Sequence, residues 1–210
     1  MKRCVIFCAA GFDGLLEPLG GEDLVIAADG GLVHTEQLKI QPHVILGDFD
    51  SLGYVPEDSR VYPVEKDDTD MMLAIRTGLS HGCKEFLLYG ALDGPRLDHT
   101  VANFQALSYL SELGAYGWLI GRDHIVTCVK NSGLVFSEKA QGILSVFCQG
   151  SEARGVTIEG LHYPLEQGTL SPHFPLGVSN HFEGRPARIS VADGTLLVIW
   201  DRGNGLCLRE

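Results

Sequence analysis

Short apolar runs that end at acidic turns are the feature of this 210-residue chain that most constrains its fold. Four such runs stand before segments rich in Asp: Leu24–Ala27, Val44–Leu46, Val61–Val64 and Phe86–Tyr89. Runs of this length, bounded by Gly and Asp, are typical of buried parallel strands. Open α/β sheets bind ligands beyond the carboxyl ends of such strands. The pattern therefore predicts a parallel sheet with its acidic turns gathered at one edge.

The four turns are Ala28–Gly31, Gly47–Ser51, Lys66–Asp70 and Gly90–His99. Asp and Gly are good turn formers, which would explain one such segment without any function. Four of them in the first hundred residues favour a site, because carboxylates that are held together repel each other unless a cation neutralises them. A site for Mg²⁺ and a polyphosphate is the leading interpretation.

Strand and helix patterns alternate as far as residue 122. Cys4–Ala9 and Trp118–Ile120 add two strands to the four runs. One helix is expected from a cap at Thr69 to near Gly82, with four side chains on its apolar side: Met71, Met72, Ile75 and Leu79. A second is expected from about Asp98 to Gly114, with an apolar stripe at a spacing of three: Val101, Phe104, Leu107, Leu110 and Leu113.

After residue 122 the chain consists of short runs rich in β-branched residues, separated by turns. These runs are Ile125–Val129, Leu134–Phe136, Ile143–Phe147, Gly155–Ile158, Ala187–Val191 and Leu196–Trp200. We therefore predict an α/β protein in which an N-terminal Rossmann-like domain with a parallel sheet, residues 1–124, precedes a C-terminal antiparallel β-sandwich domain, residues 125–210.

Composition excludes several classes of protein. The net charge of −11 argues against nucleic-acid binding, which needs a basic stripe. No apolar stretch approaches the roughly 18 residues of a membrane span, and the apolar run in residues 1–10 is too short for a signal peptide. The six cysteines form no C-x-x-C pair, so we expect reduced cysteines, neither a disulfide framework nor a zinc site, and a cytoplasmic protein.

The acidic turns offer a specific chemistry although the common glycine-rich phosphate loops are absent from the sequence. Asp48 and Asp50, two residues apart, could aim both carboxylates at Mg²⁺; the alternative is an inert solvated turn. Asp70 could hold a metal at a helix N-terminus that attracts phosphate, or could only help to cap that helix. Arg96 could bind a phosphate, with Asp98 as a base or ligand at the next helix start; the alternative is a capping Asp beside an exposed Arg.

Taken in order, these residues resemble the thiamine pyrophosphokinase family in its bacterial form. The matching segments in the first half are Ala28–Gly31, Gly47–Ser51, Lys66–Asp70 and Arg96–His99. Those in the second half are Gly155–Pro164, Gly177–Asn180 and Asp193–Val198. Each motif is weak by itself, and the order and spacing make the resemblance specific.

The resemblance implies transfer of the diphosphoryl group of ATP to the hydroxyl of thiamine, which gives thiamine diphosphate and AMP. It also implies Mg²⁺, a homodimer with active sites shared between subunits, an ATP-binding N-terminal domain and a thiamine-binding C-terminal domain. The residue roles carried over by position are as follows: Asp48, Asp50, Asp70 and Asp98 are catalytic, and the first three bind metal; Asp29, Thr69 and Arg96 bind ATP; Tyr163, Ser179 and Asn180 bind thiamine.

One departure concerns the fourth turn. The family usually has two Gly immediately before the Arg, whereas this chain reads Leu92-Asp93-Gly94-Pro95-Arg96. The extra residue and the Pro stiffen the turn, so the role of Arg96 is the least secure of these assignments.

Other functions fit parts of the sequence. A pyrophosphokinase for another hydroxymethyl heterocycle, such as a pterin, would use the same acidic turns, but the matches at Tyr163 and Ser179-Asn180 favour thiamine. A nucleotide-binding module without turnover would not need all four carboxylates. An Mg²⁺-dependent phosphohydrolase would leave the second domain unexplained.

Overall fold

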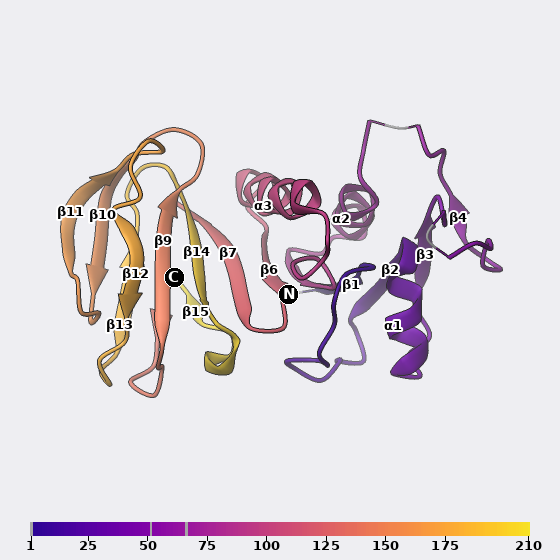
Figure 1. The fold of residues 1–210 in the computed structure, drawn as a ribbon, viewed down its shortest axis with the longest axis horizontal. Helices are drawn as coiled ribbons and strands as arrows, with labels where there is room; N and C mark the ends of the chain where they lie inside the picture. The colour runs from indigo at the N-terminus through magenta and orange to yellow at the C-terminus, as the bar shows by residue number, and fades with distance from the viewer. Residues whose placement is uncertain (1, 51, 66) are drawn as a thin grey trace. The chain divides into compact units, whose positions relative to one another are not determined.

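The computed structural model describes residues 2–50, 52–65 and 67–210 (Figure 1). Ser51 and Lys66 of the acidic turns therefore lie outside the described residues, as does Met1 of the expected N-terminal segment. The chain forms two compact units. Unit 1 comprises residues 1–106 and 114–122, and unit 2 comprises residues 107–113 and 123–210. No helix in the described ranges has both the length and the apolar character that a membrane span requires.

The protein is a mixed α/β structure. The elements of unit 1 are β1 (Arg3–Phe7), β2 (Leu24–Ala28), α1 (Leu32–Gln37), β3 (Val44–Gly47), β4 (Arg60–Val61), α2 (Asp70–Ser80), β5 (Glu85–Tyr89) and β6 (Tyr116–Ile120). Helix α3 (Leu97–Glu112) begins in unit 1 and ends in unit 2. The strands of unit 2 are β7 (His124–Lys130), β8 (Gly133–Phe136), β9 (Ile143–Cys148), β10 (Ala153–Glu159), β11 (Leu165–Leu170), β12 (Gly177–His181), β13 (Ala187–Ser190), β14 (Thr195–Asp201) and β15 (Leu208–Arg209).

The strands of unit 1 are parallel and follow the order β6-β5-β1-β2-β3-β4. Strands β1 and β2 are almost wholly buried, which explains why their sequences read as continuous apolar runs. The chain proceeds from β1 through β4 on one side of β1 and places β5 on the other side. The carboxyl end of β1 therefore lies at a topological switch point, where open α/β sheets bind ligands.

Helix α2 starts and ends where its sequence predicts. Thr69 has an extended backbone and its side chain accepts a hydrogen bond from the Met72 N–H at 3.2 Å, as an N-cap does. The helix ends at Ser80, and Gly82 follows in the left-handed region with φ +79°. Of the four residues expected on its apolar side, Met71 and Ile75 are buried, whereas Met72 and Leu79 are only partly buried.

The apolar stripe expected on α3 is wrong in part. Leu107 and Leu110 are buried, but Val101 is 50% exposed and Leu113 is 46% exposed. A strict spacing of three rotates each residue by about 60° relative to the one before on a helix of 3.6 residues per turn, so it cannot stay on one face. The buried face instead contains Asn103, Ala106, Leu107, Leu110 and Ser111.

Unit 2 is antiparallel. Its strands pair in the orders β12-β9-β14-β7 and β11-β10-β13-β8-β15. Phe136 of β8 and Trp200 of β14 contact each other edge to face, with ring centroids 5.3 Å apart, so an aromatic pair connects the two groups of strands. The β-rich second half is therefore as the sequence predicts.

Several elements differ from the sequence prediction. Val61–Val64 does not form a buried strand, because β4 covers only Arg60–Val61 and both valines are exposed. Strands β11 and β12 were not expected, since their sequences, LEQGTL and GVSNH, are mostly polar and lack a continuous apolar run. Helix α1 was also not expected, because it has only six residues and follows a Gly-Gly pair.

Candidate active site

A cavity of about 630 Å³ lies at the carboxyl edge of the parallel sheet in unit 1. Residues that directly follow β1, β2, β3 and β5 line it, together with the N-terminal ends of α2 and α3. The acidic turns are brought together here, because the carboxyl ends of parallel strands meet at one edge. Its polar lining is Asp29, Asp48, Asp50, Asp68, Thr69, Asp70, Arg96, His99, Thr100 and Asn103.

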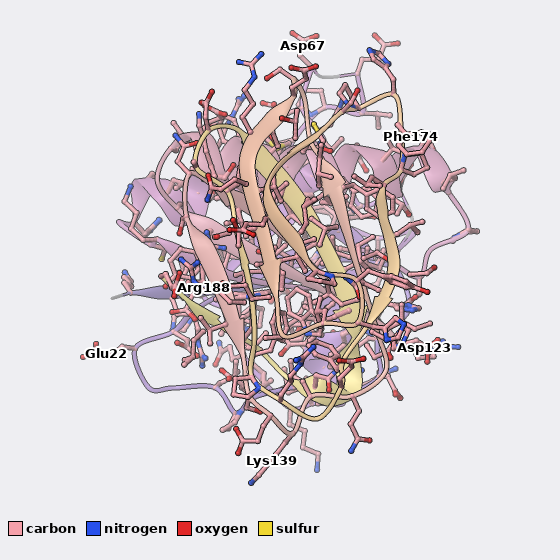
Figure 2. The ribbon with its side chains drawn as sticks, turned by 90° about the vertical axis from the view of Figure 1, so that its left-hand side faces the viewer. Glu22, Asp67, Asp123, Lys139, Phe174 and Arg188 are labelled. Atoms are coloured by element: carbon pink, nitrogen blue, oxygen red, sulfur yellow. The ribbon has the colours of Figure 1, made fainter. Side chains whose placement is uncertain are left out.

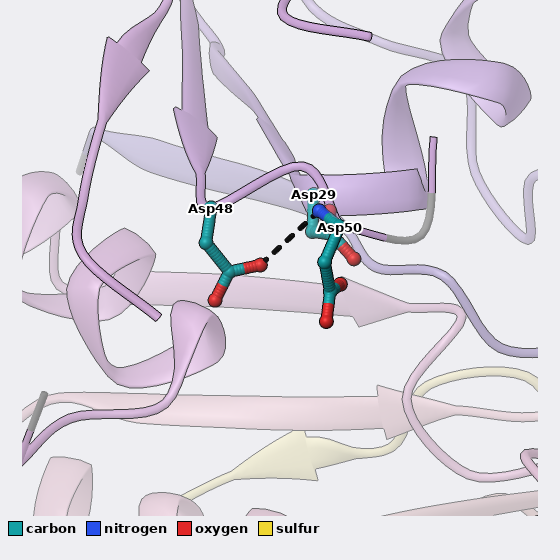
Figure 3. Close-up of side chains that lie close together, drawn as sticks. All are labelled: Asp29, Asp48 and Asp50. Atoms are coloured by element: carbon teal, nitrogen blue, oxygen red, sulfur yellow. Dashed lines mark hydrogen bonds between the residues drawn. The ribbon is translucent and has the colours of Figure 1, made fainter. Parts of the chain in front are cut away.

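Three carboxylates converge in this cavity (Figure 3). Asp29, Asp48 and Asp50 each place one oxygen so that all three oxygens lie within 4.8 Å of one another. The Asp50 N–H donates to Asp48 Oδ1 at 3.4 Å, a long contact that closes the turn after β3. Hard oxygen donors at this separation suit Mg²⁺, and the charge of a bound cation would relieve the repulsion among the carboxylates.

The backbone around the three carboxylates adopts conformations that side chains rarely take. Asp29 has φ +48° and the buried Phe49 has φ +60°. Such backbone is kept where the surrounding structure over-determines it, which is common at functional sites. Phe49 is 2% exposed, so its packing in the core turns the neighbouring Asp48 and Asp50 toward the cavity.

Gly47 allows two of the acidic turns to approach each other. Its φ is +149°, and a Cβ at this position would lie 3.0 Å from Asp29 Cα and 3.1 Å from Asp29 N. A side chain here would therefore push the turn after β3 away from the turn after β2. Glycine at position 47 is a condition for Asp29 to lie beside Asp48.

The start of α2 supplies a further carboxylate and a helix N-terminus. Asp70 is the first residue of the helix and lines the cavity. Asp68, which also lines the cavity, forms an ion pair with Arg76 at 2.6 Å. Cys8, directly after β1, lies beside these acids. Burial raises the pKa of the Cys8 thiol to about 12, and the charges of Asp70 and Asp29 contribute to the rise. The thiol is therefore protonated at neutral pH and does not act as a nucleophile.

The start of α3 carries the only described cation of the cavity lining, Arg96. Arg96 and Asp98 form an exposed ion pair at 2.6 Å. The hydrogen bond from Arg96 lowers the pKa of Asp98 below its ordinary value. Asp98 itself is not among the lining residues. Asn103 and Thr100 hold the loop before the helix by donating to the carbonyls of Ala91 at 2.8 Å and Leu92 at 3.3 Å.

The predicted acceptor residues lie in unit 2. Tyr163 is 60% exposed, and Asn180 is 3% exposed. Ser179 is exposed in a bulge of β12, with φ +58°, and its N–H donates to Ser145 Oγ at 3.0 Å. Phe174, in the loop between β11 and β12 of the same unit, is 66% exposed (Figure 2).

The sequence-predicted residues thus fall into two groups. Asp29, Asp48, Asp50, Thr69, Asp70 and Arg96 line one cavity of unit 1, whereas Tyr163, Ser179 and Asn180 lie in unit 2. Asp29 was expected only as an ATP ligand, and the geometry joins it to Asp48 and Asp50. Sequence reasoning missed Cys8 and Asn103 in the lining. The position of Cys8 directly after β1 and that of Asn103 on the buried face of α3 are the signals that could have indicated them.

Comparison with protein families gives two matches that follow each other along the chain. Residues 17–115 match "Thiamin pyrophosphokinase, catalytic domain", and residues 124–196 match "Thiamin pyrophosphokinase, vitamin B1 binding domain". The first match contains every acidic turn, and the second contains Tyr163 and Ser179. A search of curated proteins by sequence gave no match.

Solved structures share this fold over nearly the whole chain. Thiamine pyrophosphokinase from Bacillus subtilis is 23% identical with a TM-score of 0.79, over 95% of this chain and 98% of that chain. A thiamin pyrophosphokinase family protein from Enterococcus faecalis is 22% identical with a TM-score of 0.77, over 95% and 98%. Thiamin pyrophosphokinase from Candida albicans is 15% identical with a TM-score of 0.74, over 94% and 88%. With both domains matched in order, the chain belongs to the thiamin pyrophosphokinase family.

Proposed function

We propose that the cavity of unit 1 binds ATP with a divalent cation and transfers the diphosphoryl group of ATP to the hydroxyl of thiamine. The products are thiamine diphosphate and AMP, and the chain is a thiamine diphosphokinase. One observation carries the assignment of the site: three carboxylates meet within 4.8 Å at the carboxyl edge of a parallel sheet. Thr69 and Asp70 at the start of α2, Arg96 directly before α3 and Asn103 within α3 line the same cavity.

Mg²⁺ is the cation that fits this donor set, because it prefers carboxylate oxygens and keeps several waters. Asp29, Asp48 and Asp50 would hold it, and Asp70 lines the same cavity from α2. When bound, Mg²⁺ would neutralise charge on the phosphate oxygens during transfer.

The chain's own residues position the reactants. Thr69 and Asp70 open α2, whose N-terminus favours a phosphate, and Asp29 lies beside the strand end where ATP would enter. Arg96 would bind a phosphate in exchange for its exposed partner Asp98, a small loss because exposed ion pairs contribute little. The proton of the thiamine hydroxyl would pass to one of four carboxylates: Asp48, Asp50, Asp70 or Asp98.

The acceptor would be bound by unit 2. The exposed ring of Tyr163 offers a face to the thiazolium cation, and Ser179 and Asn180 belong to the same site. We therefore retain the division into an ATP- and Mg²⁺-binding Rossmann-like domain, residues 1–124, and a thiamine-binding sandwich domain, residues 125–210. We also retain a cytoplasmic homodimer in which each active site takes residues from both subunits.

The test is incubation with Mg-ATP and thiamine, followed by separation of the nucleotide products. Equal amounts of AMP and thiamine diphosphate support the proposal. ADP with thiamine monophosphate would indicate a single phosphoryl transfer, and release of phosphate that does not depend on thiamine would indicate a phosphohydrolase.

A further inference from the structure

Asn180 is engaged on both sides of its amide by one neighbouring residue. Its Oδ1 accepts from the Tyr163 N–H at 2.9 Å, and its Nδ2 donates to the Tyr163 carbonyl at 2.7 Å. Oδ1 also accepts from the His181 N–H at 3.0 Å. With the side chain 3% exposed, these bonds use the amide where a ligand cannot reach it.

The ring of Tyr163 is supported as well as its backbone. His162 meets it edge to face at 4.6 Å, and His162 stacks on His181 at 4.4 Å with an interplanar angle of 18°. His162 Nδ1 is hydrogen-bonded to Glu183 Oε1 at 2.7 Å, which fixes the outer imidazole. Tyr163 thus has an exposed aromatic side chain, while its backbone is held by Asn180 and its ring is in contact with His162.

We infer that Asn180 is a positioning residue, which holds Tyr163 in the orientation that receives the thiamine cation and does not itself contact thiamine. This inference rests on the proposed role of Tyr163. An aromatic face that is held in place loses less conformational entropy when a cation binds it than a mobile one does. The two hydrogen bonds from Asn180 to the Tyr163 backbone, here called the clamp, should therefore increase the affinity for thiamine.

A second asparagine in the same unit provides a matched control. Asn204 holds Gln141 by the same pair of bonds, since its Oδ1 accepts from the Gln141 N–H at 2.8 Å and its Nδ2 donates to the Gln141 carbonyl at 2.8 Å. Gln141 has no proposed part in the site. Asn204→Ala therefore removes an equivalent clamp without touching Tyr163.

The experiment is a double-mutant cycle with Asn180→Ala and Tyr163→Ala in the full-length protein, with Asn204→Ala alongside. KM for thiamine and for ATP, kcat and the melting temperature are measured for each variant. We expect Asn180→Ala to raise KM for thiamine at least about fivefold and to leave KM for ATP within about twofold, since it loosens one contact with the acceptor. In the Tyr163→Ala background, Asn180→Ala should change KM for thiamine no further. Asn204→Ala should lower only the melting temperature.

Provided that Tyr163→Ala itself raises KM for thiamine, three results would overturn the inference. In the first, the fold-changes in KM for thiamine caused by Asn180→Ala and Tyr163→Ala multiply in the double variant, which would mean that Asn180 acts independently of Tyr163. In the second, Asn180→Ala leaves KM for thiamine unchanged. In the third, Asn204→Ala raises KM for thiamine as much as Asn180→Ala does. If Tyr163→Ala alone has no effect on KM for thiamine, the proposed role of Tyr163 fails first, and the inference with it. Should Asn180→Ala not fold, Asn180→Asp enters the same cycle under the same criteria. This nearly isosteric change replaces the Nδ2 donor to the Tyr163 carbonyl with a carboxylate oxygen, which repels that carbonyl.

Discussion

Asp29, Asp48 and Asp50 illustrate at the scale of single residues how the fold sets the chemistry. Asp29 is far from the other two in sequence, and Phe49, with φ +60°, separates Asp48 from Asp50. One carboxylate oxygen of each nevertheless lies within 4.8 Å of the others. Like charges at this separation oppose folding and favour a cation, so each carboxylate should matter more for activity than for stability.

Asp50→Asn tests this balance. We expect kcat to fall at least about 10²-fold at saturating Mg-ATP, in line with the loss of one electrostatic contributor, while the fold stays intact. Thermal stability without Mg²⁺ should be equal or higher, because one repelling charge is gone. Asp58→Asn, in an exposed turn with φ +55°, is the control and should leave kcat unchanged. An Asp50→Asn variant with more than half of the wild-type activity would contradict the assignment.

Asp23 gives a prediction for pH. Burial raises the pKa of Asp23, but the hydrogen bonds from Arg3 and from the Gly20 N–H lower it by more, so the pKa lies below its ordinary value. A carboxylate whose folded-state pKa is lowered stabilises the fold above its unfolded pKa of about 3.9, and this stability is lost as pH falls through the folded value.

Urea unfolding at pH 7 and pH 3 measures this effect. The free energy of unfolding should drop between the two pH values in the wild type and drop less in Asp23→Asn, which has no such proton to bind. Equal drops in the two proteins would show that the Arg3–Asp23 pair does not contribute to acid sensitivity.

At the scale of elements, the turn after β3 depends on a glycine that brings it against the turn after β2. Gly47→Ala should destabilise the protein by about 1–3 kcal/mol through backbone strain and should also lower kcat, because the new Cβ would meet the Asp29 backbone at 3.0 Å. Gly53→Ala is a matched control: its φ is also positive, at +71°, but its Cβ would have no atom within 4 Å. We expect Gly53→Ala to cost stability and leave kcat intact; equal losses of kcat in both variants would refute a role for close approach.

How far the sequence predicts these elements depends on the physical signal in each. Buried parallel strands such as β1 and β2 are predicted well, because both faces are apolar and their runs are continuous. Strands β11 and β12 are not predicted, since their mostly polar sequences leave little apolar pattern to read. The sequence predicts that the acidic turns meet at one edge of the sheet. It does not predict that Asp29 joins Asp48 and Asp50, because that contact depends on strand register and on the close approach at Gly47.

At the scale of the whole molecule, the carboxylates and the acceptor residues lie in different units of the chain. In the proposed homodimer, each active site takes the carboxylates from one subunit and the acceptor residues from the other. Complementation between two impaired variants tests this arrangement. Homodimers of Asp50→Asn and of Tyr163→Ala should both be impaired, the first in transfer and the second in thiamine affinity, by roughly 1–2 kcal/mol if a cation–π contact is lost. Mixing them, with subunit exchange verified by mass spectrometry, should raise activity above the sum of the two. Exchange without a rise would place each site within one subunit.

The transfer of an intact diphosphoryl group is the central claim, and the fate of the β-phosphorus of ATP tests it most directly. The protein is incubated with Mg²⁺, thiamine and ATP labelled at the β-phosphorus, and the labelled products are separated. The account predicts that the label appears in thiamine diphosphate together with unlabelled AMP, and that Asp50→Asn slows this at least about 10²-fold. Label that accumulates in ADP would contradict it.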